Sequence, residues 1–545
     1  MTHTGTTAVS YSSGTSSVPL IGETIGANLR RVAGTFPERD AVVDRASGRR
    51  LTYAELDAEV DAIAKAFHAL GVRREDRVGI WSPNTLEWFL TQYATARIGA
   101  VLVTINPAYR SHELEFVLQQ AGIRTLVALR AFKTSDYAGM VEQVRGECPA
   151  LVDVLYTDDA SWTTFRDGGA GVDDDVLAQV DAGLDPDQPV NIQYTSGTTG
   201  FPKGATLTHH NILNNGFFVG ELCGYTEADR VCIPVPFYHC FGMTMGNLAC
   251  TSHGACAVIP APAFDPAATI EAVEAERCTS LYGVPTMFIA ELQLPDLDRH
   301  DLSSLRTGIM AGSPCPVEVM KQVIDRMNMS EVSIAYGMTE TSPVSLQTRR
   351  DDTLDQRTAT VGQVGPHLEV KIVDPETGQT TPRNVPGEVC TRGYSVMLGY
   401  WDEPEKTADV LDRAGWMHTG DIGVMDDDGF VAITGRIKDM VIRGGENVYP
   451  REIEEFLYAH PDIVDAQVIG VPDQKYGEEL MAWVRLRDGV DDLTADAVRE
   501  FCTGKLAHYK IPRYVHVVDA FPMTVTGKVR KVEMRDEAVK ILGLG

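Results

Sequence analysis

The sequence predicts an α/β protein with a large N-terminal domain of α/β layers that includes a β-rich subdomain, followed by a small mobile α+β C-terminal domain. Short β-rich runs alternate with helical patterns over most of the chain, which is typical of parallel sheets covered by helices. From about residue 361 the pattern changes to predicted strands that are separated by glycine and proline. The last part of the sequence has a helix–strand–strand–helix–strand pattern. A chain of 545 residues is long enough for several folding units.

The best local signal is a helix that begins near Leu51. Thr52 and Glu55 have the spacing of a capping box, so the helix start is well defined. The apolar positions of one helical stripe are Leu56, Val60, Ile63, Phe67 and Leu70. Four β-rich runs, RVGIW, AVLVTI, TLVAL and NIQYT, are predicted as strands at residues 77–81, 100–105, 125–129 and 191–195.

The predicted domain borders follow these changes in the sequence pattern. Residues 1–20 are expected to be a disordered tail, residues 21–437 an N-terminal domain, and residues 438–545 a mobile C-terminal domain. The C-terminal domain is predicted from a helix at 451–460, strands at 464–471 and 481–487, and a further helix and strand.

Composition excludes several classes of protein. A net charge of −28 disfavours nucleic acid as a partner, because phosphate contacts need a basic face. The sequence has no run of eighteen apolar residues and no signal-peptide pattern, so we expect a cytoplasmic protein without a membrane span. Ten cysteines without a Cys-x-x-Cys pair favour reduced thiols over disulfides or a structural zinc site.

The segment YTSGTTGFPKGA, residues 194–205, is rich in hydroxyl groups and glycine and carries Lys203. This composition is typical of a loop that binds an anion such as phosphate, although ordinary solvent-exposed loops can share it. It is not a Walker A loop, because Pro202 stands before the lysine and cannot donate a backbone hydrogen bond. The sequence therefore predicts a different kind of phosphate site.

Five further segments occur with this loop: PFYHCFG, YGMTE, TGD, GRIKDMVIRGGENVYPREIE and PMTVTGKVRK. In order and spacing, the six segments resemble those of the adenylate-forming superfamily, which includes acyl-CoA synthetases, peptide-synthetase adenylation domains and firefly luciferases. The resemblance covers nearly all of the chain after residue 20. It implies an enzyme that joins a carboxylic acid to AMP and then transfers the acyl group to the thiol of CoA, with ATP, Mg²⁺ and CoA as cofactor and co-substrates.

The resemblance also implies roles for individual residues. The phosphates of ATP would be held by Thr195, Ser196, Gly197, Thr198, Thr199, Gly200 and Lys203. Tyr336 and Gly312 would lie against adenine, and Asp421 and Arg436 would bind the ribose. Glu340 would hold Mg²⁺ and Thr339 the α-phosphate, while Lys528 would bridge the carboxylate and the α-phosphate. Lys438 would be the hinge about which Gly444, Gly445 and Glu446 reach the site for the CoA step. Considered one by one, most of these residues could equally be ordinary surface or capping residues.

His239 has two possible roles. A histidine next to Cys240 could form a nucleophilic pair, but we reject this because adjacent side chains on an extended strand point to opposite faces. The resemblance implies instead that His239 contacts the reacting carboxylate.

The acid itself is predicted from the apolar segments PFYHCFGMTMGNL and YGVPTMFIAEL. They favour a medium- or long-chain fatty acid, and the same residues would also suit an aryl acid. A stand-alone adenylation enzyme, a peptide-synthetase domain, a luciferase and a non-catalytic sensor remain the rival functions. A homodimer is a further possibility, and the expected partners are otherwise small molecules.

Overall fold

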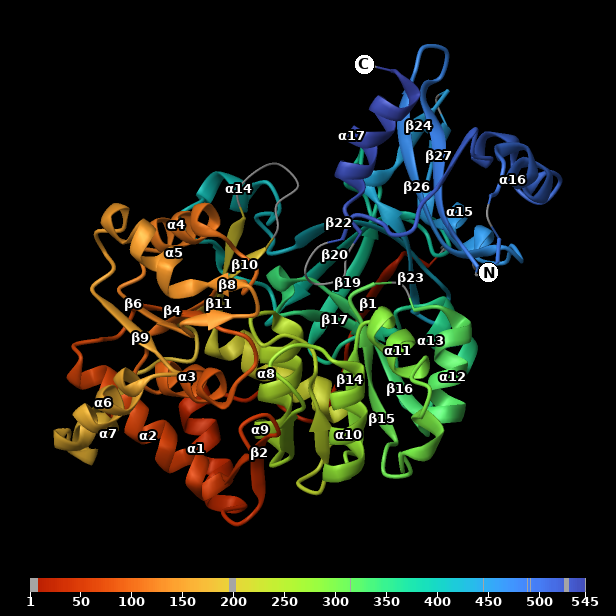
Figure 1. The fold of residues 1–545 in the computed structure, drawn as a ribbon. Coiled ribbons are helices and arrows are strands. Elements are labelled where there is room, and N and C mark those ends of the chain that lie inside the picture. The colour runs from red at the N-terminus through yellow and green to blue at the C-terminus, as the bar shows by residue number, and fades with distance from the viewer. Residues whose placement is uncertain are drawn as a thin grey trace, which may run out of the picture. The chain divides into compact units, whose positions relative to one another are not determined.

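The computed structural model describes residues 8–195, 202–313, 315–444, 446–487, 489–490, 492–523 and 529–544. The chain forms two compact units (Figure 1). The large unit comprises residues 12–370 and 391–417, and the small unit comprises residues 1–11, 371–390 and 418–545. The predicted border between residues 437 and 438 lies inside the small unit, and it stays a prediction about which part of the chain moves.

Two sheets form the frame of the large unit. The first has the order β21 (Gly399–Tyr400), β11 (Lys203–Thr208), β10 (Pro189–Thr195), β5 (Val101–Thr104), β4 (Arg77–Trp81), β6 (Thr125–Ala128), β9 (Asp153–Tyr156). The second has the order β18 (Gln363–Val364), β17 (Val344–Gln347), β16 (Glu331–Gly337), β15 (Thr307–Ala311), β14 (Ser280–Gly283), β12 (Arg230–Cys232), β13 (Cys256–Ile259), β2 (Asp40–Asp44), β3 (Arg49–Thr52). The central strands of both sheets are parallel, as the alternating pattern predicts.

Helices cover both faces of these sheets. They are α1 (Ile25–Thr35), α2 (Tyr53–Ala69), α3 (Leu86–Arg97), α4 (Ser111–Gln120), α5 (Tyr137–Val144), α6 (Ala160–Gly168), α7 (Asp174–Ala182), α8 (His209–Cys223), α9 (Ala249–His253), α10 (Pro266–Glu276), α11 (Pro285–Leu292), α12 (Val317–Met327), α13 (Leu354–Ala359) and α14 (Pro404–Ala408). The capping box of α2 is present, with Thr52 and Glu55 bonded reciprocally, and the predicted stripe is buried as far as Phe67.

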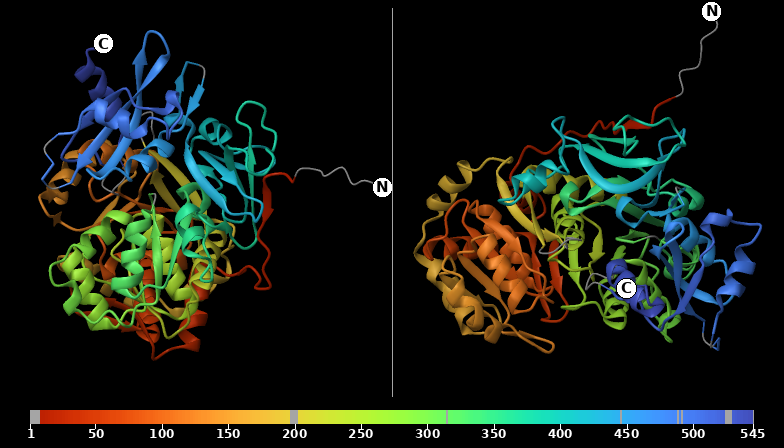
Figure 2. Two further views of the ribbon diagram at one scale, coloured as in Figure 1. Left: turned by 90° about the vertical axis from the view of Figure 1, so that its right-hand side faces the viewer. Right: turned by 90° about the horizontal axis from the view of Figure 1, so that it is seen from above.

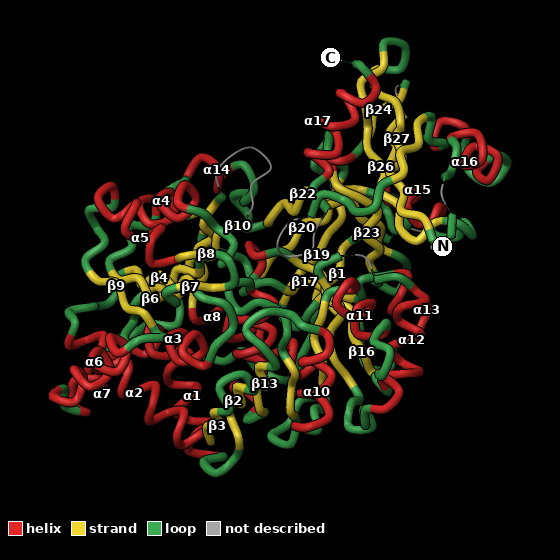
Figure 3. Tube along the Cα trace, viewed as in Figure 1, coloured by secondary structure: helices red, strands yellow, loops and turns green. Residues whose placement is uncertain are grey.

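Alternation along the strands explains the layers. Val78 and Ile80 of β4 pack with α1, α2, α3 and α8, whereas Trp81 packs with α4 and α5 on the opposite face. In the second sheet, Val42 faces the same central helices, while Val43 joins the cluster that contains α10, α11 and α12. One core cluster therefore joins the two sheets through the central helices, and separate helices cover their outer faces (Figures 2 and 3).

The small unit contains a sheet with a helix on one face and two on the other. The sheet has the order β25 (Glu446–Val448), β24 (Val441–Arg443), β27 (Gly477–Leu486), β26 (Ile463–Asp473), and β28 (Tyr514–Val517) pairs with β27. α15 (Pro450–Leu457) and α16 (Ala495–Cys502) pack on one face, and α17 (Lys531–Leu542) packs on the other. Lys531 fixes the start of α17, because its Nζ lies 2.5 Å from Oε1 of buried Glu454.

A further five-stranded sheet has most of its residues in the small unit. Its order is β1 (Tyr11–Ser13), β19 (Leu368–Val373), β20 (Gly387–Gly393), β22 (Met417–Met425), β23 (Val431–Arg436). Residues 11–13 thus form a strand, whereas the sequence predicted a disordered tail over residues 1–20. The hydroxyl-rich N-terminal segment lacks an apolar pattern, and its order comes from backbone pairing with a distant strand.

None of the ten cysteines forms a disulfide, as predicted, and nine of them are buried. Among the described residues, no helix has both the length and the apolar character needed to cross a membrane.

His209, at the start of α8, gives the large unit a pH-dependent stability. Burial lowers the pKa of His209 to about 3, and its Nδ1 accepts a hydrogen bond of 3.1 Å from the backbone N–H of Ile25. Nε2 has no hydrogen-bond partner among the described residues. Below pH 6.5 the unfolded chain binds a proton that the folded chain does not, so His209 makes stability fall as the pH falls.

We expect the protonation of His209 in the unfolded chain to lower the free energy of unfolding by about 2 kcal/mol when the pH falls from 7 to 5. In His209→Asn the amide oxygen can still accept the Ile25 N–H but cannot titrate. Urea unfolding of both proteins at the two pH values should therefore show a smaller loss of stability in the variant. Equal losses in both proteins would contradict the assignment.

Candidate functional site

The carboxyl edge of the second sheet carries two of the predicted adenine-binding residues. Ala311 of β15 and Ala335 of β16 are paired in register, so Gly312 and Tyr336 each follow the pair by one residue on neighbouring parallel strands. Gly312 has φ +89°, a conformation that favours glycine. The sheet therefore brings Gly312 and Tyr336 together at the edge where α/β proteins commonly bind ligands.

Thr339 and Glu340 follow β16 directly in a 3₁₀ turn, η5 (Thr339–Thr341). Both side chains are buried, and the backbone N–H of Met397 donates to the carbonyl of Glu340 at 2.9 Å. The turn therefore presents a carboxylate and a hydroxyl close to the residues at the end of β16.

A chain of three side chains connects this turn with the predicted phosphate loop. The Tyr400 hydroxyl donates to Oε1 of Glu340 at 2.7 Å, and the Lys203 ammonium lies 4.8 Å from the centre of the Tyr400 ring. Burial, and then the Glu340 carboxylate, raise the pKa of Tyr400 above its usual value, so its hydroxyl keeps its proton and remains a donor. Lysine, tyrosine and carboxylate thus form one polar group within the large unit.

The predicted phosphate loop connects β10 and β11, which are antiparallel. Thr195 and Lys203 are opposite each other in register at the two ends of the loop, and the Thr195 hydroxyl lies 3.4 Å from the Lys203 carbonyl. Ser196, Gly197, Thr198, Thr199 and Gly200 lie outside the described residues. The hairpin therefore fixes both ends of the loop and places Lys203 next to Tyr400.

His239, Cys240 and Thr339 lie together. The extended strand that was expected at His239 and Cys240, and that was the reason to reject a His–Cys pair, is wrong. The segment is a turn that enters a π-helix, η3 (Phe241–Leu248), not an extended strand. Cys240 Sγ is therefore 3.6 Å from His239 Nδ1 and 3.8 Å from the Thr339 hydroxyl. His239 Nδ1 also accepts the Phe241 N–H at 3.2 Å. Substrate binding by His239 stays a prediction.

The predicted acyl segment is a buried apolar helix. All residues of η3 are buried, and Phe241, Met243 and Met245 belong to the core cluster between the two sheets. Tyr282 packs against Phe241 with ring centres 5.6 Å apart, and its hydroxyl donates to the Met245 carbonyl. The two segments that the sequence singled out are therefore in contact.

The small unit contains the predicted ribose-binding pair. Asp421 on β22 and Arg436 on β23 are directly opposite in an antiparallel register, and Arg436 Nε lies 3.1 Å from Asp421 Oδ1. The Thr419 hydroxyl accepts the N–H of Asp421 and donates to the Val389 carbonyl. A carboxylate held in this way can accept hydrogen bonds from two hydroxyls of a cis-diol.

The predicted hinge and CoA-step residues also belong to the small unit. Lys438 lies in a 3₁₀ turn, η6 (Ile437–Asp439), whose Asp439 is 2.6 Å from Arg535 on α17. Gly444 has φ +62° in the tight connection between β24 and β25, and its N–H donates to the Tyr476 carbonyl. Glu446 begins β25 and is exposed. Gly445 and Lys528 lie outside the described residues.

Comparisons with known proteins identify the family. The model of the AMP-binding enzyme family matches residues 29–401, and the model of the AMP-binding enzyme C-terminal domain matches residues 452–528. The chain belongs to the AMP-binding enzymes, that is, to the adenylate-forming superfamily. A putative acyl-CoA synthetase YngI of Bacillus subtilis is 48% identical over 96% of this chain and 99% of its own length. The mitochondrial medium-chain acyl-CoA ligase ACSF2 of Danio rerio is 43% identical over 99% of this chain and 92% of its own length.

Solved structures of AMP-binding enzymes share the fold. ATP-bound MatB from Rhodopseudomonas palustris has a TM-score of 0.86 at 31% identity, over 96% of this chain and all of MatB. The anthranilate CoA ligase AuaEII, in complex with anthranoyl-AMP, has a TM-score of 0.83 at 26% identity, over 96% of this chain and 98% of its own. The predicted family and fold class are therefore confirmed.

Sequence reasoning missed two residues of this AMP-binding enzyme's candidate site. Tyr400, in the motif GYW after β20, links Glu340 with Lys203, and Cys240 lies between His239 and Thr339. Tyr400 comes sixty positions after Glu340, and only the pairing of β21 with β11 brings it to the site. No local pattern in the sequence indicates this contact.

The residues present fit the predicted magnesium ion. Glu340 offers a hard oxygen ligand, and because Tyr400 donates to Oε1, a cation would be held through Oε2. Mg²⁺ usually needs only one or two carboxylates when phosphates of a substrate complete its ligands, and the predicted phosphate loop begins and ends near Tyr400. When bound, Mg²⁺ would neutralise phosphate charge.

Proposed function

We propose that this protein is an ATP-dependent fatty-acid–CoA ligase that acts on medium- or long-chain acids. The observation that carries the proposal is the group formed by Lys203, Tyr400 and Glu340 beside Thr339, which combines a cation, a neutral donor, a carboxylate and a hydroxyl. It is supported by the acyl-CoA ligases among the relatives and by their coverage of almost the whole chain.

The proposed reaction has two steps. A carboxylate oxygen of the acid attacks the α-phosphorus of ATP, the bond to the β-phosphate breaks, and pyrophosphate leaves. The thiol of CoA, losing its proton, then attacks the acyl carbon, and AMP leaves with the oxygen that the carboxylate supplied. The first step joins two anions, so catalysis depends on charge neutralisation and positioning.

The predicted site residues divide between the two steps. Lys203 would bind the leaving phosphates, Thr339 would donate to the α-phosphate, and Glu340 would hold Mg²⁺ through Oε2. Tyr336 and Gly312 would contact adenine, and Asp421 would accept hydrogen bonds from the ribose hydroxyls. Lys528 would bridge the two reacting anions.

For the second step, a rotation about Lys438 would bring Gly444, Gly445 and Glu446 to the site.

The apolar acyl tail is inferred from the helix η3. Phe241, Met243 and Met245 are apolar and adaptable in shape, and they follow His239, the residue proposed to contact the carboxylate. A tail that extends from His239 along η3 would therefore enter apolar surroundings. The medium-chain ligases among the relatives agree with this inference.

A series of acids tests the inference. Each methylene that is transferred from water to an apolar channel contributes about 0.8 kcal/mol, which is close to fourfold in affinity. We expect kcat/KM to rise from butanoate to at least octanoate, with benzoate below octanoate, in an assay of CoA-dependent AMP formation. A flat or falling series with benzoate highest would contradict a fatty-acid specificity.

An aryl-acid CoA ligase is the second candidate. The similarity to the anthranilate CoA ligase favours it, and Phe241 and Tyr282 could stack on an aromatic ring. An enzyme of this kind would prefer one ring and reject longer flexible tails. The same series of acids distinguishes the two candidates, and the proposed adenylation residues are common to both.

Location in the cytoplasm and assembly as a homodimer belong to the proposal as well. The ACSF2 relatives are named as mitochondrial proteins, so a tagged copy of the chain should be localised directly. Sedimentation of the purified protein would give its oligomeric state.

A further inference from the structure

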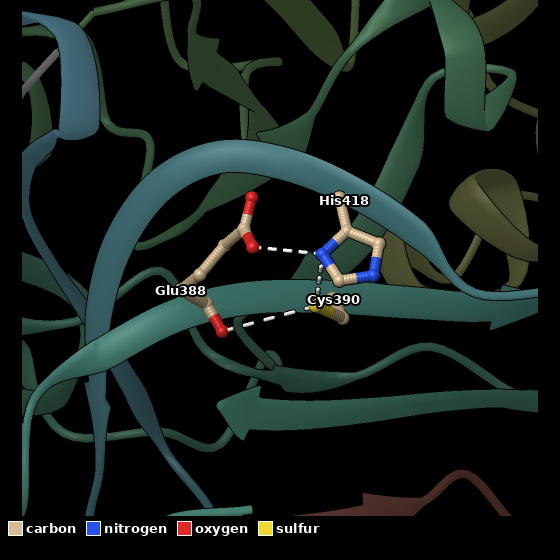
Figure 4. Close-up of side chains that lie close together, drawn as sticks. All are labelled: Glu388, Cys390 and His418. Atoms are coloured by element: carbon tan, nitrogen blue, oxygen red, sulfur yellow. Dashed lines mark hydrogen bonds and ion pairs between the residues drawn. The ribbon is translucent and has the colours of Figure 1, made fainter. Parts of the chain in front are cut away.

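Three side chains with different metal-binding chemistry lie together in the small unit, and none of them is among the residues proposed for catalysis. They are Glu388 and Cys390 of β20 and His418 of β22 (Figure 4). One ligand atom from each, a carboxylate oxygen, a sulfur and a ring nitrogen, lies within 4.8 Å of the other two. The distances are 2.7 Å from Glu388 Oε2 to His418 Nδ1 and 3.5 Å from Cys390 Sγ to the same nitrogen.

The sheet explains why these residues meet. Glu388 and Cys390 are two positions apart on β20, so their side chains leave the same face of the sheet. His418 is the second residue of β22, which is the neighbouring strand, and it approaches that face from across the pair. The absence of a Cys-x-x-Cys pair in the sequence therefore does not exclude a metal site, because strand pairing supplies the ligands from residues about thirty positions apart.

We propose that Glu388, Cys390 and His418 form a binding site for Zn²⁺ or a similar divalent transition metal. Tetrahedral zinc with bonds of about 2.3 Å to sulfur and about 2.0–2.1 Å to nitrogen separates these two ligand atoms by about 3.5 Å. The distance from Cys390 Sγ to His418 Nδ1 is already 3.5 Å. The Glu388 oxygen, 2.7 Å from the nitrogen, would have to move away from it by about 0.6 Å to reach the separation of two ligands of a tetrahedral zinc ion, and it lies within 4.8 Å of the sulfur.

The surroundings suit such an ion. Cys390 is fully buried and the Glu388 side chain is 11% exposed, whereas the His418 side chain is 32% exposed and gives a route for entry and for a water molecule as fourth ligand. The other oxygen of Glu388, Oε1, accepts the Gly420 N–H at 3.0 Å, which holds the carboxylate in place. A set of thiol, imidazole and carboxylate ligands selects Zn²⁺, Co²⁺ or Cu²⁺ over Mg²⁺.

Binding requires proton release. Cys390 would bind as the thiolate and His418 through Nδ1 with its proton moved to Nε2, so the hydrogen bond to Glu388 is replaced by two bonds to the metal. Affinity should therefore increase with pH. The proposal does not depend on the ligase function, because metal binding can be measured without any substrate.

Titration of the purified chain with Co²⁺ tests the site. We expect one Co²⁺ per chain with a thiolate-to-metal charge-transfer band that Zn²⁺ abolishes by competition. Cys390→Ser should remove the band, and both Cys390→Ser and His418→Gln should raise the dissociation constant for Zn²⁺ at least about 10-fold. Because His418 is partly exposed, His418→Gln keeps the test valid if Cys390→Ser does not fold.

A matched control is Cys502→Ser, which removes another buried thiol of the small unit, on α16. We expect this variant to keep the band and the affinity of the parent protein. Absence of Co²⁺ binding, a band that survives in Cys390→Ser, or an unchanged dissociation constant in His418→Gln would overturn the proposal.

Discussion

Replacement of Glu340 by glutamine is expected to lower the rate of acyl-AMP formation at saturating substrates by at least about 100-fold. A single preorganised electrostatic interaction can stabilise a charged transition state by this factor. Glutamine keeps the shape and can still accept the hydrogen bond from Tyr400, so the fold around η5 should remain. Only the negative charge that would hold Mg²⁺ is lost. Pyrophosphate release with ATP, Mg²⁺ and octanoate measures the effect.

Two variants distinguish the effect of the Glu340 charge from the effects of other groups. Tyr400→Phe removes the hydroxyl but keeps the ring beneath Lys203 and the charge of Glu340, so we expect a loss of about 10-fold, which is near the lower end of the value of one hydrogen bond to a charged group. Glu318→Gln, on the exposed side of α12, should have no effect. A Glu340→Gln protein as active as Glu318→Gln would show that this carboxylate is not the magnesium ligand.

For Lys528→Ala we expect acyl-AMP formation to fall by at least about 100-fold, while thioester formation from supplied acyl-AMP is retained. In the proposed mechanism this lysine neutralises the two anions that react in the first step, and the second step has no such need. Stopped assays of the two half-reactions, one with ATP and acid and one with acyl-AMP and CoA, measure the difference.

Lys540→Ala is the control for this experiment, because Lys540 is an exposed lysine on α17. It should leave both half-reactions unchanged. If Lys528→Ala lost both half-reactions equally, the lysine would have a role in binding or folding common to both steps, and its assignment to the first step would be wrong.

Local patterns in the sequence predicted much of the fold. The capping box and apolar stripe of α2 and the strands β4, β5 and β6 are all present, because each of these elements is indicated by residues close together in the sequence. The sequence assigns Asp421 and Arg436 to the ribose only through the resemblance, and their pairing on adjacent strands is a finding of the structure.

The sequence does not predict the contacts that arise when strands far apart in the chain pair with each other. Tyr400 meets Glu340 only because β21 adds to the edge of β11, and Glu388 and Cys390 meet His418 only because β20 and β22 are neighbours. The segment at His239 was misinterpreted for a different reason. Its aromatic and apolar residues are typical of a strand, but the chain turns there and enters the π-helix η3.

The transfer of oxygen from the acid to AMP is the most direct test of the proposed activity. With octanoate labelled with ¹⁸O in both carboxylate oxygens, ATP, Mg²⁺ and CoA, the proposed mechanism places one ¹⁸O atom in the phosphate of AMP and none in pyrophosphate. Mass spectrometry of the products measures this. Formation of ADP with ¹⁸O in inorganic phosphate, or of AMP without label, would contradict the account.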